Sequence, residues 1–185
     1  MTGVPMFRTI RQRFRDIGTI KALSFEAEKL ANADGQKEPG AEHFVLSALA
    51  LPDGTARKAF LRIHADPDNF RAAIARQYEE ALKNVGVAIP PDAIVASEET
   101  SLPTGPIYKV QPSAQALMQT MIYEIKVKEQ KEDPAAPLLG AHVLLAATTA
   151  QYGVAARAFR AMGIDSASLV DAAKAEIAAH RTARL

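Results

Sequence analysis

The chain lacks cysteine and tryptophan altogether, and aromatic residues make up only 6% of its 185 residues. Without cysteine there can be no disulfide, no thiolate nucleophile and no cysteine-ligated zinc. Because so few residues are aromatic, any core has to be built mainly from Ala, Leu, Ile and Val. Side chains of this size favour helices that pack closely together.

Long hydrophobic runs are missing as well. The longest, such as residues 143–147, fall far short of the roughly 20 residues that a helix needs to span a bilayer. No apolar segment follows the first residues in the way that a secretory signal requires. We therefore expect a cytoplasmic protein that does not act on a membrane.

An excess of either charge is also lacking, since 22 Lys and Arg residues stand against 21 Asp and Glu residues, for a net charge of +1. A protein that coats nucleic acid is usually far more basic. The local exception is a basic patch of Arg8, Arg11 and Arg15. Two interpretations of this patch stay open: it contacts phosphates or an acidic partner, or it is the solvated face of an amphipathic helix. We favour the second.

What the sequence does contain is helical periodicity. Phe7, Ile10, Phe14 and Ile17 recur three and four residues apart, which places them on one helical face, with the arginines on another. This first helix is expected to end near residues 32–35, where an Asn-Ala-Asp-Gly sequence favours a C-cap. Further helices are predicted at about 41–51, at 56–63 and from Asp66-Pro67 onward, the last with a buried stripe of Phe70, Ile74, Tyr78 and Leu82.

The second half of the sequence repeats the first. With a shift of 99 residues, positions 43 to 80 align without a gap. The matched pairs include His43 with His142, Gly54 with Gly153, Phe60 with Phe159 and Asp66 with Asp165. Upstream, the second copy holds roughly five extra residues, near 126–137. The pattern predicts one all-α domain over residues 1–185, a pseudo-two-fold duplication of a four-helix repeat with about eight helices.

The two repeats are expected at about residues 17–83 and 112–181, with a linker between them at about 84–111. Four prolines in this linker, Pro90, Pro91, Pro103 and Pro106, forbid a continuous helix. The linker is either a surface tether or, since it is longer than ordinary loops, a segment with a role in binding. We favour the tether.

Sequence signatures of catalysis are absent. There is no Gly-x-x-x-x-Gly-Lys-Ser/Thr loop for ATP, no His-Glu-x-x-His zinc site and no Gly-x-Ser-x-Gly nucleophile turn. His43 and His142 begin equivalent apolar helices, and two roles stay open for them: metal ligation, or a structural hydrogen bond to a neighbouring loop. We favour the structural role. The sequence predicts no catalytic residue, cofactor or metal, and a hydrolase with an unrecognised site is the weaker alternative.

The repeated residues resemble a known family. The segments that carry the resemblance are 40–46 with 56–60 in the first copy, and 140–145 with 153–159 and 162–165 in the second. In their order they are similar to the Clp N-terminal domain, the paired repeats at the front of Clp-type AAA+ unfoldases. The resemblance covers residues 17–180. It implies a double-repeat fold that recognises proteins and delivers them to an ATPase ring, here as a stand-alone module without the ATPase.

The resemblance also implies candidate binding residues. In some members of the family, the Glu of a Gly-Thr-Glu-His motif in each repeat binds phosphorylated arginine. The first copy keeps this carboxylate as Glu42, after Ala41, whereas the second reads Gly140-Ala141 and has a methyl group in its place. A methyl group cannot grip a guanidinium, so the resemblance leaves at most one half-site. Glu42 has a second reading, as a first-turn carboxylate that complements the helix dipole.

The function expected from the sequence is a non-catalytic protein-binding module. Its partner would be a Clp unfoldase, an adaptor or a substrate, bound near Ala41, Glu42, Gly140 and Ala141. The alternative is a regulator that binds nucleic acid through the basic patch, an interpretation against which the small net charge weighs.

Overall fold

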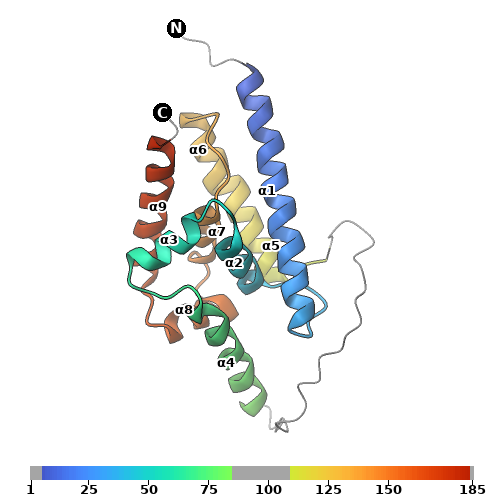
Figure 1. Cartoon of the computed structure of the whole chain (residues 1–185). Coiled ribbons are helices and arrows are strands. Elements are labelled where there is room, and N and C mark those ends of the chain that lie inside the picture. The colour runs from blue at the N-terminus through green and yellow to red at the C-terminus, as the bar shows by residue number, and fades with distance from the viewer. Residues whose placement is uncertain (1–5, 85–108, 184–185) are drawn as a thin grey trace.

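Eight continuous helices make up the part of the chain that the computed structural model describes, residues 6–84 and 109–183, with side chains from residue 11 onward (Figure 1). Their bounds are α1 (Met6–Ala33), α2 (Ala41–Ala50), α3 (Thr55–Arg62), α4 (Asn69–Asn84), α5 (Pro112–Gln119), η1 (Thr120–Lys126), α6 (Val127–Glu132), α7 (Gly140–Ala147), α8 (Val154–Ala161) and α9 (Ser166–Thr182). The segments α5, η1 and α6 follow one another without a break and form a single long helix. These two ranges contain no strand, so the predicted all-α fold is confirmed.

The helices pack in reciprocal pairs. A long helix, two short ones and another long one occur in this order twice, once before residue 85 and once after residue 108. In the middle, α2 packs on α7. Around this pair, α3 packs on α9 and α4 packs on α8. The last two helices of each half therefore pack against the last two helices of the other half. A duplicated repeat with a pseudo-two-fold axis would pack in this way, although the duplication itself stays a prediction.

Buried apolar side chains from both halves form one continuous core. Alanine supplies much of it, as the composition predicted, and four phenylalanines supply the largest fully buried rings. Three of these rings meet where the halves join: Phe60 of α3, Phe70 of α4 and Phe159 of α8. Their centroids lie 5.9 Å apart for Phe60 and Phe70, 6.2 Å for Phe60 and Phe159, and 5.1 Å for Phe70 and Phe159.

The start of α7 lies very close to α2 and α3. A Cβ atom added at Gly140 would come within 2.9 Å of the carbonyl oxygen of Ala48 and 3.2 Å of the Cβ of Ala56. The backbone of Ala48 cannot move away from an added Cβ atom as easily as the end of a flexible side chain can. Glycine at this position therefore lets α7 approach the end of α2 and the start of α3 directly.

The ends of several helices follow the sequence expectations. Helix α1 ends at Ala33, and Gly35 adopts a left-handed conformation with a φ of 72°, as a C-cap requires. Asp165 caps α9, because its Oδ2 accepts a hydrogen bond from the amide of Ser168 at 2.9 Å. Helix α4 begins later than expected, at Asn69, because residues 67 and 68 form a turn of their own.

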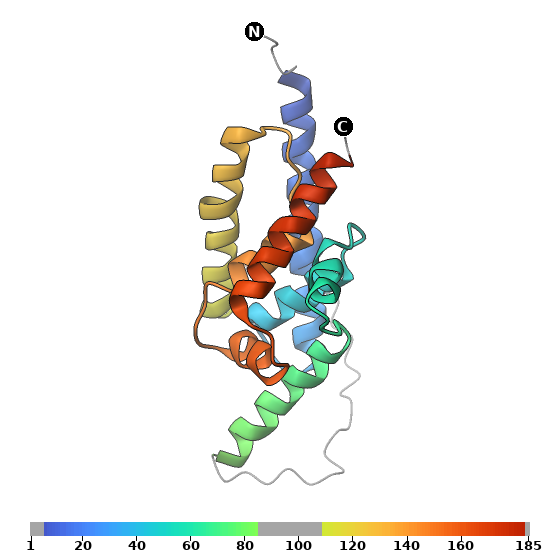
Figure 2. The same ribbon diagram turned by 90° about the vertical axis from the view of Figure 1, so that its left-hand side faces the viewer.

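Two apolar stripes differ from their predicted roles. The stripe of α4 is buried at Phe70 and Ile74 but exposed at Leu82, because the end of this helix extends beyond the other helices (Figures 1 and 2). On α1, the core contacts a different face from the one marked by Phe14 and Ile17, which are 69% and 48% exposed. The face that is buried instead carries Gln12, Asp16, Leu23, Ala27 and Ala31.

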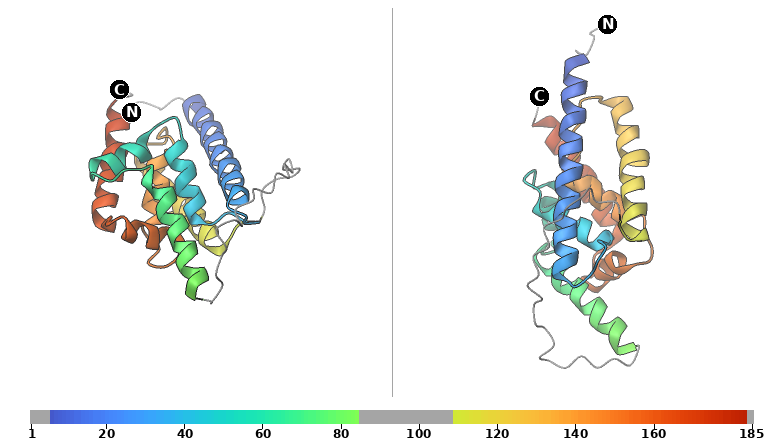
Figure 3. Two further views of the ribbon diagram at one scale, coloured as in Figure 1. Left: turned by 60° about the horizontal axis from the view of Figure 1, so that its bottom comes forward. Right: turned by 90° about the vertical axis from the view of Figure 1, so that its right-hand side faces the viewer.

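Helix α1 runs along the edge of the molecule, and its first turns project beyond the other helices (Figures 2 and 3). The apolar spacing alone could not choose between the two faces of this helix. Small alanines on the buried face allow close packing against α2, while polar Gln12 and Asp16 find hydrogen-bond partners in the interior.

Most of the predicted linker lies outside the described residues. Its final residue, Gln111, is tied to the loop between α1 and α2. The side-chain amide donates hydrogen bonds to Gln36 Oε1 at 2.7 Å and to the carbonyl of Glu38 at 3.0 Å, and the backbone amide donates to the carbonyl of Pro39 at 3.0 Å. These bonds fix the point at which the second half of the chain begins. None of the helices in the described ranges has an apolar stretch that could cross a bilayer.

Candidate functional site

The four residues expected to bind a partner lie in the interior. Ala41, Glu42, Gly140 and Ala141 are all buried. Three of their backbone amides, which could have received an anion, already donate to acceptors within the chain. The bonds run from Ala41 to Ser113 Oγ (3.2 Å), from Gly140 to Asp53 Oδ2 (3.1 Å) and from Ala141 to Thr55 Oγ1 (3.0 Å). A ligand at these helix starts would have to displace internal hydrogen bonds.

Glu42 connects α2 to α4. The hydroxyl of Tyr78 donates a hydrogen bond to Glu42 Oε1, and burial together with this carboxylate raises the pKa of Tyr78 above its ordinary value. The carboxylate is also folded back over Gly40, where an added Cβ atom would lie 2.5 Å from Oε1. Glycine at position 40 therefore makes room for the carboxylate, and Tyr78 already donates to one of the two oxygens that a bidentate guanidinium would use.

The two equivalent histidines have the same structural role. Nδ1 of His43 accepts a hydrogen bond from the amide of Gly40 at 3.0 Å, and Nδ1 of His142 accepts one from the amide of Leu139 at 3.0 Å. The other ring nitrogen, Nε2, lies 3.0 Å from Glu129 Oε2 in His142, whereas in His43 it lies 3.4 Å from Asp34 Oδ2 and has no hydrogen-bond partner among the described residues. Both histidines therefore make a structural hydrogen bond through Nδ1, and they differ at Nε2.

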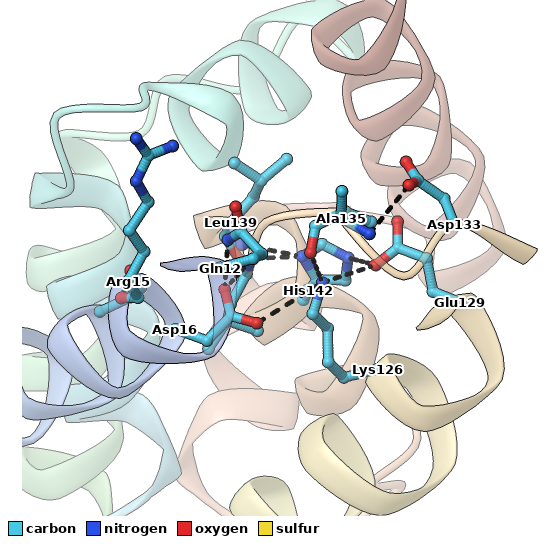
Figure 4. Close-up of polar contacts among 12 residues, drawn as sticks. Gln12, Arg15, Asp16, Lys126, Glu129, Asp133, Ala135, Leu139 and His142 are labelled. Atoms are coloured by element: carbon cyan, nitrogen blue, oxygen red, sulfur yellow. Dashed lines mark hydrogen bonds and ion pairs between the residues drawn. The ribbon is translucent and has the colours of Figure 1, made fainter. Parts of the chain in front are cut away.

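A buried ionic cluster joins α1 to the second half of the chain (Figure 4). We define it as Asp16, Lys126, Glu129, His142 and Arg181. Lys126 lies at its centre: Nζ donates to Glu129 Oε2 at 3.1 Å and to the carbonyl of Ala136, and lies 4.0 Å from Asp16 Oδ2.

Asp16 and Glu129 have further donors around them. Asp16 Oδ1 accepts from Gln12 Nε2 at 2.8 Å and from the amide of Leu138 at 2.8 Å, so it fastens α1 to the loop before α7. Glu129 accepts from Arg181 of α9 at 3.1 Å on its other oxygen. Each buried charged group in the cluster therefore has a partner of opposite charge or a hydrogen bond to a neutral group, as buried charges require.

A π-helical segment brings Lys126 to the interior. The buried positions along this helix are Ala114, Leu117 and Met121, three and four residues apart, and the next is Lys126 after five. The wider turn of η1 shifts the inward face by one residue, which places a lysine where an α-helix would place Glu124 or Ile125. Only one sequence signal pointed here: the extra residues of the second copy near 126–137.

The cluster lowers the pKa of Glu129 to about 2, from an ordinary value of 4.5. Burial alone would raise it. The hydrogen bond from His142 and the electrostatic attraction of His142 and Lys126 act in the opposite direction and outweigh the effect of burial.

This lowered pKa predicts a stability that depends on acid pH. A carboxyl with a lowered pKa stabilises the folded state above pH 4.5, and this contribution is lost as the pH falls toward about 2. We expect the free energy of unfolding to fall over this range by about 1–2 kcal/mol more in the wild type than in Glu129→Gln. Urea unfolding at several pH values measures the difference.

Glu132→Gln is the matched control, since Glu132 is an exposed carboxylate in the same helix. Asp68 and Asp165 also have lowered pKa values, and their contribution is common to all three proteins. If Glu129→Gln keeps the pH dependence of the wild type, the cluster does not stabilise the charged form of Glu129.

An apolar groove opens between α1, α2 and the α5–η1 helix. Its volume is about 220 Å³, smaller than the roughly 300–1,000 Å³ pockets that hold drug-sized ligands. Tyr123 stands at its edge with 71% of its surface exposed. The groove is lined by Ser24, Phe44, Val110, Gln115, Met118, Gln119, Ile122 and Tyr123. Its size and lining suit one apolar side chain of a bound peptide.

The predicted basic patch lies on the surface where it is described. Arg11 and Arg15 are exposed, and Arg15 points away from the ionic cluster (Figure 4). Arg8 belongs to α1, but its side chain lies outside the described residues. Within residues 11–84 and 109–183, Arg11 and Arg15 have no acidic partner.

The structure therefore presents a closed ionic cluster, an open apolar groove and a basic helix surface. Within the described ranges, no group of three or more His, Asp or Glu side chains is arranged to hold a metal ion. Neither a known protein family nor a curated protein matches the chain.

Proposed function

We propose that the chain is a non-catalytic protein-binding module of the cytoplasm, related to the Clp N-terminal domain, that serves a Clp-type unfoldase as adaptor, substrate receptor or regulator. The observation that carries the proposal is the apolar groove between α1, α2 and the α5–η1 helix. Tyrosine is enriched among residues that dominate binding between proteins, and Tyr123 stands exposed at the edge of this groove.

The groove is suited to binding rather than to chemistry. Tyr123 is its one titratable side chain, and the rest of the lining is apolar apart from Ser24, Gln115 and Gln119. General acid–base catalysis needs titratable groups that converge on a substrate. Among the described residues, buried ionisable groups are instead bonded within the chain in the ionic cluster, in the pair of Glu42 and Tyr78 and in the pair of Glu176 and Arg62.

Relation to the Clp repeat is supported by residues that match across the two halves. His43 and His142 make the same hydrogen bond to the backbone three residues earlier. Gly54 and Gly153 both precede a helix, α3 and α8, with a positive φ, but their ψ angles of 3° and 173° differ. Chance similarity in an alanine-rich chain would not require the shared hydrogen bond of the two histidines.

The proposal is tested by measuring binding to a purified Clp-type unfoldase from the same cell, to its adaptors and to its substrates, by isothermal titration calorimetry. We expect one of the three to bind, and we expect Tyr123→Ser to weaken that binding about tenfold. Tyr152→Ser is the matched control, since Tyr152 is 83% exposed and lies in the loop before α8, away from the groove lining.

Two results would contradict the proposal. One is the absence of binding to all three classes of protein. The other is an equal loss of affinity, or none, in Tyr123→Ser and Tyr152→Ser, because the groove would then not be the binding surface. Nucleic acid that copurifies with the chain and binds with a steep salt dependence would favour the alternative regulator.

A further inference from the structure

We infer that the outer face of α1 is a second docking surface, and that its partner is an acidic amphipathic helix of another protein. The inference rests on the proposed function, since it describes how a binding module would engage a partner. The surface is an apolar stripe of Phe14, Ile17 and Phe25, and its position on α1 differs from that of the groove.

The stripe forms one straight row. Residues 14, 17, 21 and 25 are separated by three, four and four positions, so they follow one face of the helix. Phe14, Ile17 and Phe25 are 69%, 48% and 55% exposed, and the face that packs on the core lies on the other side of α1. A helix with apolar residues on two opposite faces presents the outer one to a partner.

A helix is the shape that fits this row. Helical partners dock through apolar side chains repeated every three or four residues, and the row has the same spacing. Helix α1 runs along the edge of the molecule (Figures 2 and 3), and the exposed row on its outer side is accessible to a partner helix.

The charges around the row select an acidic partner. Arg11 and Arg15 lie along one margin, Arg13 lies along the other, and Lys21 lies within the row. All four side chains are exposed, and none has an acidic partner within the described ranges. Over residues 11–21 of α1 the one acid, Asp16, is buried and bonded inside the ionic cluster, and Glu26 and Glu28 follow only at the Phe25 end of the row. Complementary charge therefore has to come from the partner.

The same charges disfavour two other occupants. In a symmetric dimer the row would meet itself, and Lys21, which lies within the row, would come close to the Lys21 of the second copy. On a membrane, Lys21 would lie in the middle of the inserted face, whereas peripheral helices keep their cations on the polar face. An acidic amphipathic helix can pack its apolar side chains on the row and place a carboxylate beside Lys21.

The test measures the fluorescence anisotropy of two labelled helical peptides of ~21 residues, which share leucines at the a and d heptad positions. One carries Glu at the flanking e and g positions, and the other carries Lys. We expect the wild type to bind the acidic peptide at least about tenfold more tightly than the basic one at low salt. The double variant Phe14→Ser/Ile17→Ser should bind the acidic peptide about tenfold more weakly.

Two further variants separate the contributions. Arg11→Glu/Arg15→Glu should reverse the preference between the two peptides. Leu61→Ser is the matched control, since Leu61 is an exposed apolar residue on α3, and it should leave the affinity unchanged. Urea unfolding of each variant, expected to match the wild type within about 0.5 kcal/mol, shows that altered binding does not come from altered folding.

Several outcomes would overturn the inference. These are equal affinity for the two peptides, tighter binding to phosphatidylserine vesicles or to a DNA duplex than to the acidic peptide, and a dimer that Phe14→Ser/Ile17→Ser abolishes. If Tyr123→Ser weakens binding of the Clp partner while the acidic peptide does not bind, the docking surface on α1 is wrong and the proposed function stands. If the acidic peptide binds at α1 and no Clp protein binds, the proposed function fails alone.

Discussion

Replacing Phe60 by alanine is expected to lower the free energy of unfolding by about 3–5 kcal/mol, because the ring is fully buried and its removal leaves a cavity. The effect should reach both halves of the chain. Phe60 of α3 contacts Phe70 of α4 and Phe159 of α8, with centroid distances of 5.9 Å and 6.2 Å. Since α3 also packs on α9, the cavity would form where the two predicted repeats pack against each other.

Urea unfolding followed by far-ultraviolet circular dichroism measures this loss. The matched control is Phe25→Ala, which removes the same ring from a surface position and should change stability by less than about 0.5 kcal/mol. A double-mutant cycle of Phe60 and Phe159 should give a coupling of about 0.5–1.5 kcal/mol. If Phe60→Ala instead separates unfolding into two transitions, the halves are independent domains and the single duplicated domain expected from the sequence is wrong.

The sequence allowed the helical fold to be predicted because short-range signals define it. Turn residues at 52–54 and the Asn-Ala-Asp-Gly sequence at 32–35 mark helix ends through local backbone preferences. The shift of 99 residues predicted that α2 corresponds to α7 and α3 to α8, and the duplication stays a prediction. Helix α4 departs from the prediction at its start because the capping pattern did not exclude a separate turn at Pro67 before Asn69.

The candidate site could be predicted only in part, since it depends on long-range packing. A carboxylate near a helix start reads equally well as a ligand contact or as an internal acceptor, and Tyr78, which donates to Glu42, is 36 residues away. The outer stripe of α1 had the right spacing for a core face. The opposite face is buried instead, and there Asp16 accepts from the amide of Leu138, 122 residues away, a partner that no local pattern shows.

Lys126 illustrates the same limit, and its replacement is expected to have the second large effect. Lys126→Met keeps most of the volume and removes the charge. Asp16 and Glu129 then lose a cation that lies 4.0 Å and 3.1 Å from them. Removing one partner of a buried ion pair leaves an uncompensated charge, so we expect a loss of about 3–5 kcal/mol in the free energy of unfolding at pH 7.

The loss should depend on pH in a direction that identifies its cause. Lys126 helps to hold the pKa of Glu129 at about 2, so the pKa rises in Lys126→Met and the carboxyl becomes protonated at a higher pH. Protonation removes the uncompensated charge, and the difference in stability between variant and wild type should therefore shrink as the pH falls below about 4.5. Urea unfolding between pH 7 and pH 3 measures this change.

Local and global effects of Lys126→Met can be separated, because Asp16 is the point at which the ionic cluster holds α1. Native-state hydrogen exchange should show faster exchange for amides of α1 near Asp16 than for amides near Leu23, where alanine packing against α2 is unchanged. Lys128→Met, two residues further on and on the exposed side of the helix, should alter neither stability nor exchange beyond about 0.5 kcal/mol. If both lysine variants behave alike, Lys126 is a solvated surface cation and the π-helical turn of η1 has no part in fastening α1 to the second half of the chain.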